Sequence, residues 1–254
     1  MVFGTSLNHA TALIVGASQG IGLGFVQQLL RDQRFGRVYG TYRRPESAQG
    51  LLALANHPAL TGLRMDVTQE STIAEAIAKI QSLTPQLHLV VYCVGLLHEG
   101  HLQPEKSLGQ LNSDQLGRLF QTNAVGAALL AKHLLPLLKH DQPSVLAAIS
   151  AKIGSIGDNH LGGWYGYRAS KAALNMLIKT AAIEYARKSP NTTLALLHPG
   201  TTDTRLSQPF QRGVPAEKLF TVERTVAQLM TVIDQLEPAN SGEFFNWDGA
   251  PLPW

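Results

Sequence analysis

A glycine-rich segment directly after a short apolar run restricts the fold of this chain more than any other feature. The run Thr11–Val15 is typical of a buried strand in a parallel sheet. Gly16-Ala17-Ser18-Gln19-Gly20-Ile21-Gly22 follows it at once, and apolar side chains recur at helical spacing from Phe25 to Leu30. A strand, a glycine turn and a helix in this order are typical of a fold that binds phosphate groups at the helix N-terminus.

The three glycines of this turn have different expected roles. Gly16 permits the turn, Gly20 lets the backbone approach a pyrophosphate, and Gly22 lets the helix pack closely. The helix N-terminus adds backbone N–H groups and a partial positive charge. The alternative is an ordinary tight turn from strand to helix. The cofactor contacts expected here are Gly16, Ser18, Gln19, Gly20, Ile21 and Gly22.

Two adjacent arginines follow the second expected strand, Arg37–Thr41. A dinucleotide fold that prefers NAD places an acidic residue at this strand end, where it binds the ribose 2′-hydroxyl. Here the strand leads instead into Arg43 and Arg44, and the next acid, Glu46, lies beyond a proline. Guanidinium groups form charge-assisted bonds with phosphate, so the pair favours NADP over NAD. A solvated basic turn is the alternative.

Later strand ends supply further candidate cofactor contacts. After the strand Gly62–Val67, Asp66 is a candidate either for the adenine amino group or for the cap of the next helix. Gly95 follows the strand Leu87–Tyr92 and permits close approach to a ribose. After the strand Thr192–Leu197, the hydroxyls of Thr202 and Thr204 are candidates for binding a carboxamide or a phosphate. The alternative is that they only cap the turn. The contacts expected from these ends are Asp66, Val67, Gly95, Pro199, Gly200, Thr202 and Thr204.

Tyr167 and Lys171 are four residues apart in a stretch that favours a helix starting near Tyr165. Positions i and i+4 share one helix face, so the phenol and the ammonium should lie together. A nearby cation lowers the pKa of a phenol from about 10 and makes it a usable general acid. The alternative is an ordinary surface pair. Asn123, within a helical run Leu116–Leu138, is a candidate for holding a water near this pair or a tolerated surface residue.

Composition excludes several other classes of protein. The chain has 254 residues, 44% of them hydrophobic and 15% charged, which indicates a globular core. Its net charge of +3, without a long basic run, gives no support for nucleic-acid binding. The single cysteine excludes an intramolecular disulfide and fits a cytoplasmic location, and the histidines match no zinc-site spacing, so no metal is expected. No targeting segment or membrane-length apolar stretch is visible.

Taken together, these motifs resemble the short-chain dehydrogenase/reductase family. The glycine turn, Asp66, Asn123, Tyr167 and Lys171, and Pro199-Gly200 match that family in order and approximate spacing. The stretch from Gly162 to Lys171 and the C-terminal residues resemble its C-factor-like carbonyl reductase branch. The resemblance implies one α/β domain over residues 1–254, with a doubly wound, mainly parallel, seven-stranded Rossmann-type sheet and helices on both faces. The composition of about 205–221 suits a substrate lid.

Two departures from the family pattern stand out. The family usually has Asn-Asn-Ala-Gly after its fourth strand, where this chain has Tyr92-Cys93-Val94-Gly95. The family's catalytic serine aligns with Ala151. Ser150 is next to that position but should point to the other side of an extended strand. Ser155 is a second candidate if its loop folds back.

The resemblance implies a catalytic set of Asn123, Tyr167, Lys171 and a serine, with Ser150 the residue that we assign. NADPH would supply a hydride to a small-molecule carbonyl, or NADP would oxidise an alcohol, and Tyr167 would exchange the proton. Lys171 would bind the nicotinamide ribose. The family also implies a homodimer or homotetramer formed through the Asn123 and Tyr167 helices. The alternative is an NADP-binding regulatory or signalling protein with a partly degenerate site, which Ala151 and Cys93 favour.

Overall fold

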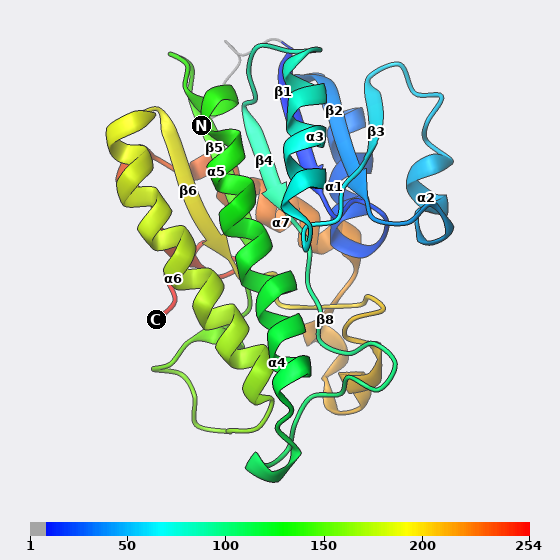
Figure 1. The fold of residues 1–254 in the computed structure, drawn as a ribbon, viewed down its shortest axis with the longest axis vertical. Helices are drawn as coiled ribbons and strands as arrows, with labels where there is room; N and C mark the ends of the chain where they lie inside the picture. Colours follow the sequence, from blue (N-terminus) through cyan, green and yellow to red (C-terminus); the bar gives the residue numbers. More distant parts are fainter. Residues whose placement is uncertain (1–8) are drawn as a thin grey trace.

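A seven-stranded parallel sheet forms the centre of the molecule (Figure 1). The structure is a computed structural model and describes residues 9–254. The strand order is β3-β2-β1-β4-β5-β6-β9, so the order reverses between β1 and β4. The strands are β1 (Ala10–Val15), β2 (Phe35–Tyr42), β3 (Leu60–Arg64), β4 (Leu89–Tyr92), β5 (Ser144–Ile149), β6 (Thr192–Leu197) and β9 (Glu243–Phe245).

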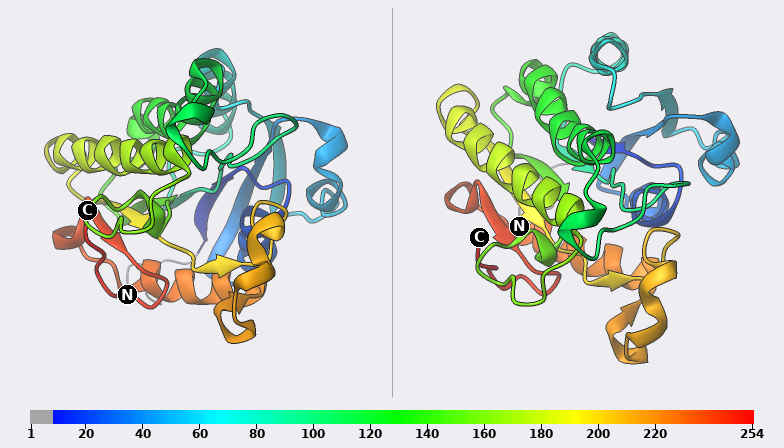
Figure 2. Two further views of the ribbon diagram at one scale, coloured as in Figure 1. Left: turned by 90° about the horizontal axis from the view of Figure 1, so that it is seen from below. Right: turned by 60° about the horizontal axis from the view of Figure 1, so that its bottom comes forward.

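Helices cover both faces of this sheet, as the two further views show (Figure 2). Helices α1 (Gly20–Arg31) and α7 (Val222–Gln235) pack on one face. Helices α3 (Glu70–Gln81), α5 (Gly126–Leu138) and α6 (Tyr165–Lys188) pack on the other. The predicted doubly wound fold, with seven strands and two helical layers, is therefore confirmed.

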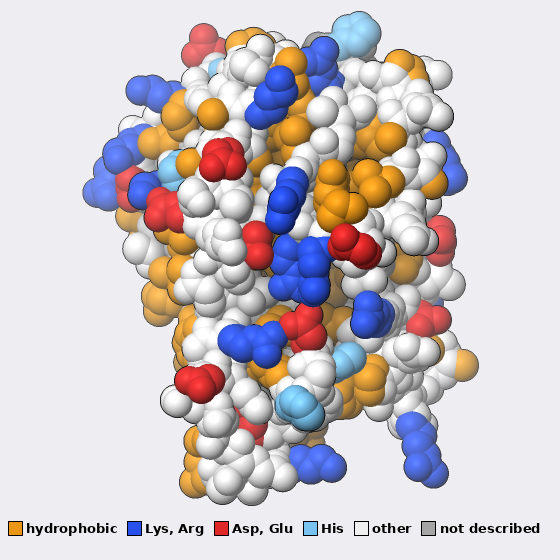
Figure 3. All heavy atoms as spheres, turned by 45° about the vertical axis from the view of Figure 1, so that its right-hand side comes forward, with side chains coloured by type: hydrophobic (Ala, Val, Ile, Leu, Met, Phe, Trp, Pro, Cys, Tyr) orange, Lys and Arg blue, Asp and Glu red, His pale blue; other side chains and the backbone are white. Residues whose placement is uncertain are grey.

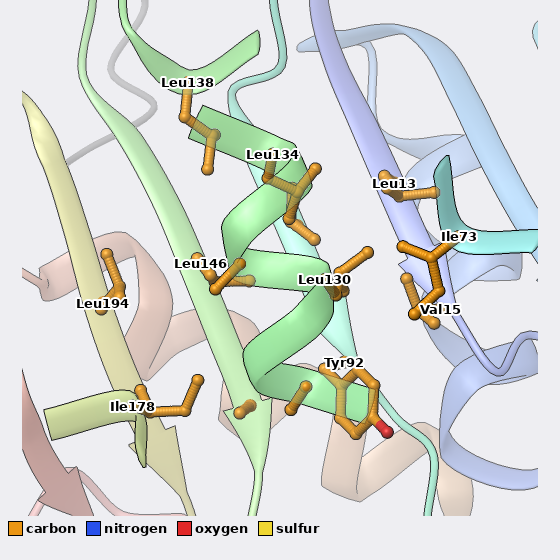
Figure 4. Close-up of a cluster of buried hydrophobic side chains, with 14 of the residues drawn as sticks. Leu13, Val15, Ile73, Tyr92, Leu130, Leu134, Leu138, Leu146, Ile178 and Leu194 are labelled. Atoms are coloured by element: carbon orange, nitrogen blue, oxygen red, sulfur yellow. The ribbon is translucent and has the colours of Figure 1, made fainter. Parts of the chain in front are cut away.

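The central strands are mostly apolar because both of their faces are buried. β1, β4, β5 and β6 have no exposed residue. One core cluster lies between the sheet and α3, α5 and α6, where Leu130 and Leu134 pack against Leu146 and Tyr92 (Figure 4). The alternate strand residues form a second cluster with α1 and α7. Strands fixed in this way from two sides hold their carboxyl ends rigidly.

The expected single helix Leu116–Leu138 is instead three consecutive segments. Helix α4 (Ser113–Phe120) leads into a π turn, Gln121–Val125, which continues into α5. The prediction of one continuous helix was therefore wrong at its centre. A π turn adds a residue to the helical repeat and is frequent at functional sites. Asn123 lies in this turn.

Short elements that the sequence did not indicate lie near the carboxyl ends of the strands. They include α2 (Gln49–Leu52), and a two-stranded parallel ribbon of β7 (Thr201–Thr202) and β8 (Leu219–Phe220). The ribbon ties the end of the expected lid to the segment after β6. No helix in residues 9–254 is long and apolar enough to cross a membrane.

Candidate active site

The glycine turn connects β1 to α1 in a conformation that requires glycine. Gly16 and Gly20 have φ values of +83° and +55°, which side chains rarely adopt. A Cβ on Gly22 would lie 2.2 Å from the carbonyl oxygen of Gly16. The side chain of Gln19 does not cap α1, and the first turn of this helix contains no acidic residue. The N-terminal N–H groups of α1 can therefore bind an anion, and the expected pyrophosphate contact stays a prediction.

Arg43 and Arg44 directly follow β2, so the expected basic pair lies at the carboxyl end of this strand. Both are solvent-exposed, and both face the carboxylate of Glu99. Glu99 comes from the segment between β4 and α4. No sequence pattern indicates this partner, because the residues lie far apart in the chain and the fold alone brings them together.

Strand β3 ends at Arg64, and Asp66 lies in the turn that follows it. Its carboxylate accepts hydrogen bonds from the backbone N–H and the hydroxyl of Thr68, at 3.0 and 2.7 Å. Helix α3 begins only at Glu70, after the N-cap residue Gln69. The helix-capping alternative for Asp66 was therefore wrong, since the carboxylate closes a local turn. Val67 is buried beside the start of α5, with its carbonyl against Gly126.

Tyr167 and Lys171 lie on the buried face of α6, as the spacing of four predicted. Only 8% of Tyr167 and 2% of Lys171 is exposed, so the surface-pair alternative was wrong. Lys171 Nζ lies 5.9 Å from the centroid of the Tyr167 ring and donates a hydrogen bond to the carbonyl of Ile149 at 2.9 Å. A Cβ on Gly95 would lie 3.8 Å from the same Nζ. Helix α6 thus presents a phenol and an amine to the ends of β4 and β5.

The pKa of the Tyr167 phenol is raised, not lowered as the nearby Lys171 led us to expect. Burial raises the pKa of Tyr167 above its usual value of 10. Burial also lowers the pKa of Lys171 from 10.5 to about 8. The Nζ atom of Lys171 binds a backbone carbonyl and lies over the ring, and forms no hydrogen bond with the phenol oxygen among the described residues. The phenol therefore carries its proton at neutral pH and can act as a proton donor.

Asn123 is completely buried and joins two parts of the site. Its side chain accepts a hydrogen bond from Leu96 N and donates one to Leu96 O, at 2.7 and 2.8 Å. Its second N–H bonds the hydroxyl of Ser170 on α6 at 2.9 Å. Because Asn123 is buried, the surface alternative was wrong, while the expected contact with a water stays a prediction. The side chain fixes the backbone next to Gly95 against the helix of Tyr167.

The two serine candidates lie in different surroundings. Ser150 is buried, and its hydroxyl donates a hydrogen bond to Asn175 Oδ1 at 2.6 Å. Its proton is thereby committed within the protein. Ser155 is equally buried and accepts a bond from the backbone N–H of Asp158, which leaves its own proton available. Gly154 next to it packs directly on Lys171. The geometry thus disfavours Ser150 as a donor to a substrate and favours Ser155.

The segment after β6 curves over the glycine turn. Gly200, with φ +71°, packs beneath Phe220, and Pro199 accepts a long 3.4 Å bond from the hydroxyl of Thr202. Thr202 is buried and shares a 2.8 Å bond with Thr225, so this hydroxyl fits the turn-capping alternative. The methyl group of Thr204 lies 3.3 Å from the Cβ position of Gly20. Of these residues, Thr204 lies against the proposed pyrophosphate turn.

A chain of aromatic contacts leads from Tyr167 to the expected lid. The ring of Trp164 lies 6.3 Å from that of Tyr167 and 4.7 Å from that of Phe210. Phe210 also meets His98, whose Nε2 lies 3.2 Å from the carbonyl oxygen of Leu206. Trp164, Phe210 and His98 therefore lie together near Tyr167. Phe220 lies apart from them, because its ring packs on Trp247.

A family model described as short chain dehydrogenase matches residues 10–214. The chain belongs to the short-chain dehydrogenase family. A crystal structure of an NADPH-bound carbonyl reductase from chicken fatty liver superposes with a TM-score of 0.86 and 28% identity, over 99% of this chain and 98% of that one. The carbonyl reductase Sniffer of Drosophila melanogaster gives 0.86 and 29%, over 97% and 100%. C-signal from Myxococcus xanthus is 32% identical over 148 residues, which are 58% of this chain and 84% of that protein.

Membership in the short-chain dehydrogenase family confirms the predicted resemblance. Two residues that support the site were nevertheless absent from the sequence-based prediction. Asn175 continues the spacing of four from Tyr167 and Lys171, and that spacing was a usable signal for it. Glu105 carries no such signal, yet it is buried and accepts a 3.1 Å bond from the N–H of Gly166 at the start of α6.

Proposed function

We propose that this chain is an NADPH-dependent oxidoreductase that reduces a small-molecule carbonyl to an alcohol, with Tyr167 as the proton donor. The observation that carries the proposal is the burial of the Tyr167 phenol and the Lys171 amine together, at strand ends that also present the glycine turn. Both solved carbonyl reductases cited above support it, one of them bound to NADPH.

The residues present fit a nicotinamide dinucleotide. The glycine turn and the N-terminus of α1 would hold the pyrophosphate, because side chains at Gly16, Gly20 and Gly22 would block or strain that approach. Arg43 and Arg44 would hold the 2′-phosphate of NADP. Lys171 would hold the nicotinamide ribose next to Gly95. Asp66, Val67 and Thr204 remain proposed contacts at the rim.

Bound NADPH supplies the hydride. Tyr167 gives its proton to the carbonyl oxygen, and the raised pKa of the phenol keeps that proton in place until transfer. Lys171 faces the phenol ring and stabilises the phenolate that is left. Asn123 positions both by fixing the backbone of Leu96 to α6 through Ser170. The hydroxyl of Ser155 would polarise the carbonyl, since the proton of Ser150 is bound to Asn175.

The apolar surroundings favour a substrate with a flat, apolar body. Trp164 and Phe210 lie against each other on the lid side of Tyr167, and we propose that residues 205–221 form the substrate lid of a single domain. The substrate would be an aldehyde, a ketone or a quinone. We further propose a homodimer or homotetramer, supported by the exposed apolar residues Met176, Leu177 and Ile183 on α6. Light scattering in solution measures that state directly.

The test of the enzymatic function is a screen of aldehydes, ketones and quinones for oxidation of NADPH. Turnover of at least one carbonyl, lost on removal of the Tyr167 hydroxyl, is the expected result. The second candidate is an NADP-binding regulator. The buried bond from Ser150 to Asn175 and the alanine at position 151 favour it, because the usual serine donor is absent. NADPH binding without turnover of any carbonyl in the screen would support this second function.

A further inference from the structure

Three arginine side chains from two distant segments surround one carboxylate. Glu99 Oε1 lies 3.2 Å from the guanidinium of Arg43 and 3.7 Å from that of Arg44. Its Oε2 is paired with Arg118 on α4. None of these arginines has another carboxylate partner within residues 9–254. The face that includes these strand ends carries mixed blue and red side chains across its centre (Figure 3).

The charges of this cluster do not balance. Three guanidinium groups carry three positive charges, and Glu99 contributes one negative charge. Partial burial raises the pKa of Glu99. The bond from Arg43 and the charges of Arg43 and Arg118 lower it by more, so the pKa is below its usual value. The carboxylate is therefore ionised at neutral pH. The cluster therefore has a net charge of +2, and an anion that replaced the Glu99 carboxylate would face three guanidinium groups.

A carboxylate and a phosphate bind guanidinium groups in the same way, through pairs of charge-assisted hydrogen bonds. The position of Glu99 therefore marks where an anion fits between the arginines. Arg43 and Arg44 are already proposed to bind a phosphate at this place. Arg118 reaches the same carboxylate from the opposite segment, so it is directed toward the same anion position.

We propose that Arg118 is a third ligand of the cofactor's 2′-phosphate, and that the Glu99 side chain occupies this phosphate site until the cofactor displaces it. This inference rests on the proposed function and deepens it. Two anions cannot share the site, since a phosphate next to Glu99 would be repelled. Glu99 thus lowers the affinity for NADPH and leaves the affinity for NADH unchanged, because NADH has no phosphate there.

The backbone allows this exchange by rotation of one side chain. Glu99 N and O both bond Leu102 at 3.1 Å, which holds the loop independently of the arginines. The side chains of Glu99, Arg43, Arg44 and Arg118 are 41%, 45%, 60% and 51% exposed. Water can therefore solvate the carboxylate once it leaves, and the competition is modest. Exposed pairs of this kind correspond to roughly a two- to tenfold change in affinity in total.

The test is a measurement of Kd for NADPH and for NADH, by titration of the full-length protein. Glu99→Gln removes the competing charge and should strengthen NADPH binding roughly two- to tenfold, with NADH unchanged. Arg118→Gln should weaken NADPH binding by a similar factor or more, again with NADH unchanged. Glu46→Gln is the matched control, since Glu46 is exposed near the arginine pair but forms no ion pair with it; it should leave both affinities unchanged.

Each outcome decides one part of the proposal. Unchanged or weaker NADPH binding in Glu99→Gln overturns the competitor role, and unchanged NADPH binding in Arg118→Gln overturns the third ligand. Equal effects on NADH show that the residues act on folding or on the adenosine rather than on the phosphate, and they overturn the inference as well. A wild-type protein that binds neither cofactor overturns this inference together with the proposed function. Normal binding effects without carbonyl turnover overturn only the proposed function.

Discussion

Ser150 donates the proton of its hydroxyl to Asn175 Oδ1 across 2.6 Å, and both side chains are buried. Asn175 follows Lys171 by four residues on α6, so this bond joins the end of β5 to the helix of the candidate active site. The carbonyl of Ile149, next to Ser150, accepts the bond from Lys171. The Ser150–Asn175 bond therefore fixes the strand end that orients Lys171, which is a positioning role.

This relationship predicts different effects for the two serines. Ser155→Ala should lower turnover by about tenfold or more while the affinity for NADPH stays unchanged, because it removes a donor to the carbonyl. Ser150→Ala should mainly lower the thermal midpoint, since it leaves the buried amide of Asn175 without its partner. Steady-state kinetics and thermal unfolding of both variants distinguish these effects.

Ala151→Ser completes the comparison. This change restores a hydroxyl at the position where the family usually has one, and it should raise turnover without changing NADPH affinity. If all three variants show wild-type turnover, polarisation of the carbonyl by these serines is ruled out.

The second prediction concerns cofactor preference. Arg43→Ala and Arg44→Ala should each weaken NADPH binding by roughly tenfold or more, because each removes charge-assisted bonds of about 1.5–3 kcal/mol. NADH binding should stay nearly unchanged. Titration of each variant with both cofactors gives the answer, and an equal loss for NADPH and NADH would refute the assignment of the arginines to the 2′-phosphate.

The buried amine of Lys171 should destabilise the fold although the proposed function requires it. Burial lowers the folded-state pKa of Lys171 from 10.5 to about 8, so the unfolded chain binds the extra proton between these values. The contribution of this group to stability is present above pH 10.5 and is lost as the pH falls toward 8. Lys171→Met should thus make the protein roughly 1–3 kcal/mol more stable at pH 7, after allowance for the lost bond to Ile149.

The same variant should lose most of its turnover. Urea unfolding of wild type and Lys171→Met at about pH 7 and about pH 10 measures the difference in stability, which should shrink at the higher pH. A Lys171→Met protein that is less stable than wild type at neutral pH would show that the buried amine stabilises the fold, contrary to this account.

The fold was predictable because its signals are local. The central strands are short apolar runs, and the turn Gly16–Gly22 combines glycine spacing with a following helix in a way that few folds require. The expected strand limits lie close to the observed ones, and the i, i+4 spacing placed Tyr167 and Lys171 on one buried face. The departures occur where long-range contacts decide, as at the π turn around Asn123, whose side chain bonds Leu96.

The electrostatics of the site were not predictable from spacing. Four-residue separation showed that Lys171 lies near Tyr167, but not that both are desolvated or that the amine bonds Ile149. Burial therefore reversed the expected shift of the phenol pKa. The carboxylate partners Glu99 and Glu105 come from an irregular polar segment without periodicity, so only the folded chain reveals which backbone and side-chain groups they contact.

The central claim is that the Tyr167 hydroxyl donates the proton to the substrate. Tyr167→Phe keeps the ring, its contact with Trp164 and the helix, and removes only the oxygen. Tyr165→Phe is the matched control, because Tyr165 lies on the same helix but is 36% exposed. Turnover and NADPH affinity of both variants are measured with the most active carbonyl from the screen.

On this account, turnover of Tyr167→Phe falls by about 10²–10⁴-fold, the usual contribution of a general acid, while its NADPH affinity and the turnover of Tyr165→Phe stay close to wild type. Near-normal turnover of Tyr167→Phe would contradict the account and remove Tyr167 as the proton donor.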